Sequence, residues 1–308
     1  MSIAMVFPGQ GSQSQGMQAD LAEKFPAVTA TYAEASEILG YDLWDLVQEG
    51  PAEKLGETTV TQPAMLAAGV AAWRCWQTAG GSAPTQMAGH SLGEYSALVA
   101  AGALSFGDAV KVVKRRSELM QEAVPVGVGA MAALLGLDDD LVAEVCANAA
   151  AGQIAEPVNF NSPGQVVIAG HKDAIDRAIE LAKEAGARRA LALPVSVPAH
   201  SALMETAGVS LLDALNDVTI NTPEVPVISA SDATPYGDGD DIRKRLSRQV
   251  YSPVQWVWTV QAMIASGAGR IIECGPGKVL AGLARRIDKG TPTGFIDNLD
   301  GLNKALEA

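Results

Sequence analysis

The apolar and polar positions of the chain fall into short apolar runs and longer stretches with helical spacing. Ile3–Phe7 is wholly apolar, as expected of a buried strand, and the glycine-rich segment 8–13 follows it. Helical spacing then predicts four helices, at 28–39, Leu43–Glu49, 63–78 and 106–122. Pro63 at a first helical position and Ser105 three residues before Asp108 are typical of helix starts. Strands that alternate with helices favour the α/β class with a mainly parallel sheet.

The pattern changes near Pro125, where the following segment predicts a unit of its own. Its elements are expected in the order strand, helix, strand, strand, helix, strand, at Gly129–Leu135, 139–149, 155–160, 165–169, 172–185 and 190–193. This order is typical of the ferredoxin-like fold. We therefore predict a small ferredoxin-like domain at 125–195, inserted into a large α/β-hydrolase-like domain of residues 1–124 and 196–308. Further elements expected in the large domain are helices at 201–215, 241–249, 254–266 and from 278, and strands at 225–230 and 270–273.

The composition disfavours several classes of function. The chain has 308 residues, of which 48% are hydrophobic and 19% charged, so it can bury a large core. A net charge of −13 disfavours nucleic-acid binding, and no apolar run approaches the roughly 18 residues that a membrane span needs. The widely spaced Cys75, Cys146 and Cys274 match no disulfide or metal-binding pattern. We therefore expect a cytoplasmic protein without a metal, and a monomer.

The segment Gly89-His90-Ser91-Leu92-Gly93 carries the clearest chemical pattern of the sequence. It lies between a short apolar run and a helical stretch, and the Gly-x-Ser-x-Gly spacing in that setting is typical of a nucleophile elbow. Glycines two positions before and after the serine permit a sharp turn, and the next helix directs free N–H groups toward it. The pattern predicts an exposed nucleophile at Ser91, the alternative being a chance match in a glycine-rich chain.

A serine nucleophile needs a base, and the chain offers three histidines. His90 is adjacent to Ser91, so its side chain should diverge from the serine, and a structural role is favoured. His171 follows a predicted strand and is expected to cap the next helix. His200 ends a segment stiffened by Pro194 and Pro198, and it is the predicted base by elimination. No acid between Ser91 and His200 stands out, and a backbone carbonyl could orient the imidazole instead.

Several separate motifs give the chain a more specific likeness. It resembles the malonyl-CoA:acyl-carrier-protein transacylases of bacterial type II fatty-acid synthesis over essentially its whole length. The shared motifs occur in the order of the family and include Phe7-Pro8-Gly9-Gln10-Gly11-Ser12-Gln13, Gly89-His90-Ser91-Leu92-Gly93-Glu94, Arg116, Val158-Asn159-Phe160-Asn161-Ser162-Pro163-Gly164-Gln165, Val197-Pro198-Ala199-His200, Pro253-Val254-Gln255-Trp256 and Gly275-Pro276-Gly277-Lys278.

The resemblance implies a role for each catalytic group. Ser91 would be acylated, His200 would act as its base, and the main-chain carbonyl of Gln249 would orient His200. Backbone N–H groups of Gln10 and Leu92 would form the oxyanion hole. The reaction would be a ping-pong transfer through an acyl-serine intermediate.

The resemblance also implies the substrates. Arg116 would bind the free carboxylate of malonate, which a planar guanidinium can hold with two parallel hydrogen bonds. Gln10 and Asn161 would also contact the substrate. Malonyl-CoA would be the donor, and the acceptor would be the phosphopantetheine thiol of an acyl carrier protein, with no permanently bound cofactor. Basic residues that could dock the acidic carrier are Lys114, Arg115, Arg188, Arg189, Lys278, Arg285 and Arg286, although each could be an ordinary solvated charge.

Other functions remain open from the sequence. A Ser-His esterase or thioesterase would share the elbow. An acyltransferase could use another extender unit, such as methylmalonyl, or serve malonate decarboxylation. A catalytically silent scaffold could bind carrier protein alone.

Overall fold

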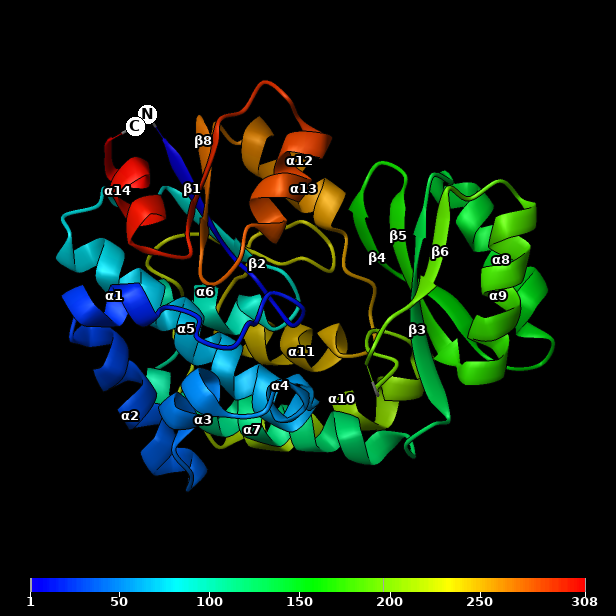
Figure 1. The fold of residues 1–308 in the computed structure, drawn as a ribbon, viewed down its shortest axis with the longest axis horizontal. Coiled ribbons are helices and arrows are strands. Elements are labelled where there is room, and N and C mark those ends of the chain that lie inside the picture. The colour runs from blue at the N-terminus through cyan, green and yellow to red at the C-terminus, as the bar shows by residue number, and fades with distance from the viewer. Residues whose placement is uncertain (1, 196, 308) are drawn as a thin grey trace.

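A five-stranded parallel sheet runs through the larger part of the molecule, with β1 at its centre (Figure 1). The computed structural model describes residues 2–195 and 197–307. The strand order is β7-β2-β1-β8-β9, and every neighbouring pair is parallel. The strands are β1 (Ile3–Phe7), β2 (Gln86–Gly89), β7 (Val227–Ile228), β8 (Arg270–Cys274) and β9 (Thr293–Ile296). Wholly buried strands such as β1 explain the continuous apolar run in the sequence.

Helices cover both faces of this sheet because successive side chains of a strand point to opposite faces. Met5 and Phe7 pack into the larger core with most of the helices, whereas Ala4 and Val6 pack into a second core beneath α12 and α13. The helices of this part are α1 (Ala19–Lys24), α2 (Ala27–Leu39), α3 (Leu43–Glu49), α4 (Ala52–Gly56), α5 (Thr58–Thr78), α6 (Gly93–Ala100), α7 (Phe106–Ala123), the short η1 (Ala202–Met204), α10 (Glu205–Asn216), α11 (Gly239–Gln249), α12 (Trp256–Ala265), α13 (Val279–Ile287) and α14 (Leu299–Glu307).

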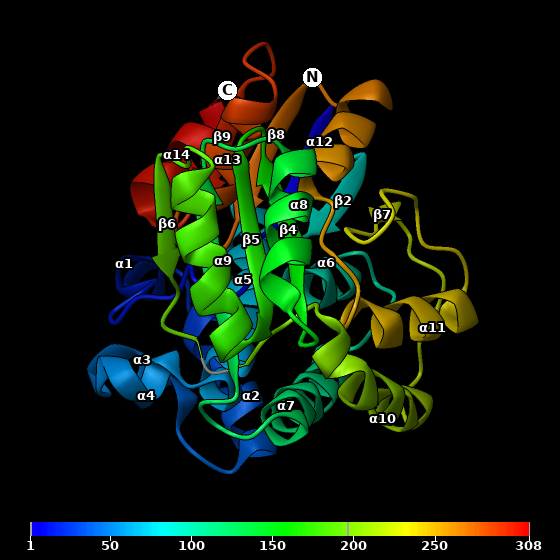
Figure 2. The ribbon, with the colours of Figure 1, turned by 90° about the vertical axis from the view of Figure 1, so that its right-hand side faces the viewer.

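A separate antiparallel sheet lies beside the larger part, on the right in Figure 1. Its strand order is β4-β5-β3-β6, and two helices cover its outer face (Figure 2). The elements are β3 (Gly129–Leu135), α8 (Asp139–Ala150), β4 (Ala155–Ser162), β5 (Gln165–His171), α9 (Lys172–Glu184) and β6 (Arg189–Ala192). The opposite face, which includes Met131 and Val158, packs against the segment that leads to His200.

The two parts are joined by backbone hydrogen bonds as well as by the chain. The N–H of Val254 donates to the carbonyl of Val158 at 2.8 Å, and the N–H of Phe160 donates to the carbonyl of Val254 at 2.9 Å. The carboxylate of Glu156 on β4 accepts from the N–H of Ala202 at 2.8 Å. These bonds fix the small sheet beside the elements that carry the site.

The α/β class and the parallel sheet predicted from the sequence are confirmed. The longer helices begin and end within a few residues of their predicted bounds, with one exception. Helix α5 begins at Thr58, so Pro63 lies inside it rather than at its start. The sequence analysis also missed α1, α4, β9 and α14. We propose that residues 125–195 form a ferredoxin-like domain between 1–124 and 196–308. Met1, Ser196 and Ala308, at the limits of these segments, lie outside the described residues.

No helix among the described residues combines the length and apolar character needed to cross a membrane.

Candidate active site

Ser91 lies at a sharp turn between β2 and α6, as the elbow pattern predicts. Its backbone φ is 53°, a left-handed conformation that residues other than glycine rarely adopt. The two flanking glycines are required by close packing. A Cβ on Gly89 would lie 1.9 Å from the carbonyl carbon of Gly93, and one on Gly93 would lie 2.0 Å from the carbonyl oxygen of Phe7. The turn therefore holds the serine hydroxyl away from the sheet, over the start of α6.

His200, which is distant from Ser91 in sequence, lies against it in the folded chain. The hydroxyl of Ser91 donates to the imidazole Nε2 at 2.7 Å. The Nδ1 of His200 donates to the carbonyl of Gln249 at 2.8 Å and also lies 3.1 Å from the carbonyl of Ser252. Two carbonyls thus fix the tautomer in which Nε2 can accept a proton, without any carboxylate partner.

Burial keeps His200 neutral. The side chain is only 3% exposed, and its pKa falls to about 3 because burial disfavours the charged imidazolium and the nearby Arg116 repels it. The imidazole is therefore an unprotonated acceptor throughout the physiological pH range.

The other two histidines have structural positions. The Nε2 of His90 lies 2.8 Å from the amide Oδ1 of Asn161. The imidazole ring of His90 also contacts the ring of Trp256 in a tilted arrangement. His171 lies at the N-cap position of α9, but its side chain makes no capping hydrogen bond. Its Nδ1 instead accepts from the N–H of Ile154 at 3.0 Å. The expected cap is therefore wrong in its contact, although the position is right.

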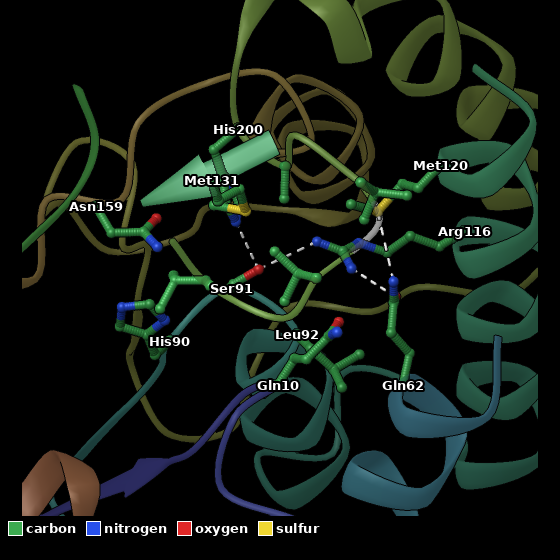
Figure 3. Close-up of a pocket in the computed structure, with 14 residues that line it drawn as sticks. Gln10, Gln62, His90, Ser91, Leu92, Arg116, Met120, Met131, Asn159 and His200 are labelled. Atoms are coloured by element: carbon green, nitrogen blue, oxygen red, sulfur yellow. Dashed lines mark hydrogen bonds between the residues drawn. The ribbon is translucent and has the colours of Figure 1, made fainter. Parts of the chain in front are cut away.

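Arg116 brings a positive charge to the same serine. It lies on α7, is only 2% exposed, and its Nη2 is 3.3 Å from the Oγ of Ser91 (Figure 3). Its other partners are two neutral amide oxygens, at 2.5 Å on Gln62 and 3.0 Å on Gln249. Among the described residues Arg116 forms no ion pair. A buried guanidinium without a carboxylate partner is suited to bind one from a ligand.

The loop after β1 forms the opposite wall. A Cβ on Gly9 would lie 2.5 Å from the carbonyl oxygen of His90 and 3.7 Å from the nitrogen of Leu92, so the two loops are in close contact. Within the described chain, the N–H groups of Gln10 and Leu92 donate no hydrogen bond. Leu92 is also the N-cap residue of α6, where the helix dipole favours negative charge.

A cavity of about 110 Å³ connects these groups. Strands of the small sheet and loops and helices of the larger part line it, and Figure 3 shows Ser91 between His200 and Arg116, with Gln10 and Leu92 below. The lining residues are Gln10, Gln62, His90, Ser91, Leu92, Arg116, Met120, Met131, Asn159, Leu193, Val195, Val197, Ala199 and His200. The arrangement combines a nucleophile, a neutral base, two free N–H donors and a fixed cation, which suits acyl transfer of a group that carries a negative charge.

Comparison with known proteins agrees with this chemistry. Residues 4–289 match the model of the acyl transferase domain family. The chain belongs to this family of acyltransferases. It is 56% identical to the malonyl CoA-acyl carrier protein transacylase of Escherichia coli strain K12 over 305 residues, which is 99% of each chain.

Solved structures of such acyltransferases superpose closely on the chain. An acyl carrier protein S-malonyltransferase from Vibrio cholerae is 55% identical with a TM-score of 0.95, and the match covers 99% of both chains. A malonyl-transacylase solved in complex with its type II polyketide acyl carrier protein is 52% identical with a TM-score of 0.98. That match covers 100% of this chain and 99% of the other.

The acyltransferase site includes polar residues that the sequence analysis missed. Gln62 and Asn159 line the cavity, whereas the predicted Asn161 pairs with His90 beside it. A glutamine at the start of the apolar run 64–72 was a usable signal, because a polar side chain in a buried helix needs a partner. Gln249 also does more than expected, since its side chain bonds Arg116 while its carbonyl bonds His200.

Proposed function

We propose that this enzyme transfers the malonyl group from malonyl-CoA to the phosphopantetheine thiol of an acyl carrier protein, through a malonyl-Ser91 intermediate, in fatty-acid synthesis. The observation that carries the proposal is that one hydroxyl, Ser91 Oγ, lies 2.7 Å from the base His200 and 3.3 Å from the guanidinium of Arg116. The names of the relatives and the carrier-protein complex support the same substrates.

In the first half-reaction Ser91 Oγ attacks the thioester carbonyl while His200 Nε2 accepts the hydroxyl proton. The carbonyl oxygen becomes an oxyanion, which the N–H groups of Gln10 and Leu92 stabilise. The C–S bond then breaks, the malonyl group stays on Ser91, and His200 returns its proton to the leaving CoA thiolate. The carbonyl of Gln249 stabilises the transient imidazolium through Nδ1.

The second half-reaction reverses these steps with a different thiol. His200 removes the proton of the phosphopantetheine thiol, whose sulfur attacks the malonyl ester. Collapse of the second tetrahedral intermediate breaks the bond to Ser91 Oγ, which recovers its proton from His200. Transfer competes with hydrolysis, and a cavity of only about 110 Å³ limits the water that can reach the ester.

Arg116 is the proposed selector of the acyl group. A malonyl carboxylate can form paired hydrogen bonds with the guanidinium, whereas an acetyl group would leave that buried charge without a ligand. Gln62 and Gln249 hold the guanidinium in place through their amide oxygens. Gln10 and Asn161 are proposed further substrate contacts.

Three of the basic residues considered for carrier docking lie together. Arg188 and Arg189 line one depression of about 550 Å³ together with Arg286, which is distant from them in sequence. Among the other basic candidates, Arg115 pairs with Glu118 and Glu122, Lys278 pairs with Asp297, and Arg285 donates to the hydroxyl of Thr293. We propose that the three arginines attract the acidic carrier, and that the enzyme acts as a cytoplasmic monomer with no resident cofactor.

Intact-mass analysis tests the proposal. Mixing the enzyme with malonyl-CoA should add one malonyl group to the protein, and adding phosphopantetheinylated carrier should move that group to the carrier. Release of free malonate without an acceptor would favour a thioesterase. Absence of any adduct would favour a silent scaffold, and preferential labelling by methylmalonyl-CoA in competition would favour another extender unit.

A further inference from the structure

Two oppositely charged side chains, one in the wall of the cavity and one outside its lining, are buried without an ion-pair partner in direct contact. Arg116 is 2% exposed and Glu94 is 0% exposed. Neither forms a salt bridge within the described chain, and charges buried this deeply are costly unless something compensates them.

One glutamine joins the two groups. The amide Oε1 of Gln249 accepts from Arg116 Nη2 at 3.0 Å, and its Nε2 donates to Glu94 Oε1 at 2.9 Å. The amide dipole is therefore aligned between the charges, with its oxygen toward the cation and its N–H toward the anion. The same Nε2 donates to the carbonyl of Ser91 at 2.8 Å, so both of its protons are used and the amide cannot reverse.

The remaining contacts of Glu94 favour its carboxylate form against the burial that opposes it. Its Oε1 also accepts from the N–H of Ala230 at 3.3 Å, and the hydroxyl of Tyr236 donates to its Oε2. The nearby Arg245 is already paired with two other carboxylates, those of Asp232 and Asp241. Arg245 lowers the pKa of Glu94 but is occupied by these two carboxylates, whereas Arg116 is the cation to which the side chain of Gln249 joins Glu94.

We propose that Glu94 is the counter-charge of Arg116, joined to it through the side-chain amide of Gln249, and that this bridged ion pair sets how strongly Arg116 binds an acyl carboxylate. A direct ion pair would occupy the guanidinium and compete with the cargo. A neutral amide between the charges stabilises Arg116 in the empty site and leaves it available. Glu94 is thus a positioning residue, and the part of the inference that concerns the cargo rests on the proposed function.

A double-mutant cycle on the empty enzyme tests the ion pair without any substrate. The variants are Glu94→Gln, which keeps the size and an acceptor oxygen, Arg116→Met, and the two together. Melting temperatures are measured at pH 8.5, because burial raises the pKa of Glu94 to about 7 and the carboxylate is ionised above it. Each single change should lower Tm by roughly 4 °C or more, since it leaves one buried charge uncompensated. In the Arg116→Met background, Glu94→Gln should instead raise Tm.

The matched control is Glu273→Gln, the same substitution at another wholly buried glutamate. Glu273 accepts from the N–H of Ala281 at the start of α13, and it makes no contact with Arg116 or Gln249. Its effect on Tm should be equal in the two backgrounds. An equal effect of Glu94→Gln in both backgrounds would overturn the ion pair.

The selectivity arm compares malonyl-CoA with acetyl-CoA in steady-state transfer. In Glu94→Gln the amide contacts can persist while the competing negative charge is lost. The malonyl-to-acetyl ratio of kcat/KM should therefore rise by roughly threefold or more, through a lower KM for malonyl-CoA. An unchanged ratio would refute the influence of Glu94 on the cargo. If Arg116→Met left the malonyl preference intact, the proposed function of Arg116 would fail while the Tm cycle still decided the ion pair.

Discussion

His200 Nε2 lies 2.7 Å from Ser91 Oγ, and both residues have a left-handed backbone, with φ of 68° and 53°. Two such conformations in contacting residues cost free energy, and the surrounding structure must impose them. The turn of Ser91 is imposed by Gly89 and Gly93, and that of His200 by the N–H bond to the carbonyl of Val250 at 2.9 Å together with the two carbonyls on its ring. The serine and its base are therefore aligned before any substrate arrives.

Replacing the nucleophile should abolish acylation. Ser91→Ala removes the hydroxyl that lies against Nε2 of His200, so intact-mass analysis should detect no malonyl adduct after incubation with malonyl-CoA. Ser96→Ala is the matched control, because Ser96 is a buried serine on the adjacent helix α6 whose hydroxyl has no hydrogen-bond partner among the described residues. The control should still be labelled. A stable adduct on Ser91→Ala would refute the assignment.

The pH dependence of transfer should reflect the lowered pKa of His200. The base works when neutral, and activity is lost as pH falls through its pKa. With that pKa near 3 rather than 6.5, kcat/KM should not fall because of His200 between pH 8 and pH 5. His200→Ala should lower the rate by several orders of magnitude, which shows that the flat profile depends on this base. An acid limb near pH 6.5 that disappears in His200→Ala would contradict the prediction.

Removing the guanidinium should change the choice of cargo. Arg116→Ala should lose preference for malonyl-CoA over acetyl-CoA, because no charge remains to bind the free carboxylate. Competition between the two acyl-CoA substrates, read out as the mass of the acyl-enzyme, measures the preference directly. Arg115→Ala is the control, since this neighbouring arginine pairs with Glu118 and Glu122 at the surface. Continued exclusion of acetyl by Arg116→Ala would mean that another group selects the cargo.

Much of the fold and of the site could be predicted because each signal is local. The elbow at Ser91 depends on neighbouring glycines, and the helix of Arg116 depends on the cap at Ser105, whose side chain accepts from the N–H of Asp108 as expected. The base was found only by elimination among three histidines. Its partners, the carbonyls of Gln249 and Ser252, leave no trace in side-chain chemistry, because every residue carries a carbonyl.

The parts that could not be predicted depend on contacts between distant segments. Pro63 is typical of a helix start, but tertiary packing extends α5 back to Thr58, whose hydroxyl donates to the side chain of Gln10. The short α4 and the edge strand β9 have too few residues for a periodic signal. The amide of Gln249 reaches both Arg116 and Glu94 only in the folded chain, so nothing local indicated its side chain.

The glycines of the elbow should not tolerate substitution, and a glycine in open space provides the control. Gly89→Ala would place a Cβ 1.9 Å from the backbone of Gly93, so the variant should lose the turn, with a large fall in Tm and no malonyl adduct. Gly282→Ala is the control, because a Cβ there meets nothing within 4 Å and the residue lies inside α13. It should raise the free energy of unfolding by about 0.5–1 kcal/mol. A fully active, stable Gly89→Ala would show that the elbow can relax.

The arginine cluster should control the encounter with the carrier protein rather than the chemistry. Arg286 is exposed on α13 and shares its depression with Arg188 and Arg189, so Arg286→Glu places a negative charge among them. The KM for the acidic carrier should rise, its dependence on salt should weaken, and labelling by malonyl-CoA in the absence of carrier should proceed as before. Lys304→Glu, on the exposed face of α14, keeps the same change of charge at a position outside the cluster and should leave that KM unaltered. Equal effects of the two reversals would mean that the carrier responds to the overall charge of the enzyme, and the three arginines would then have no special part in docking.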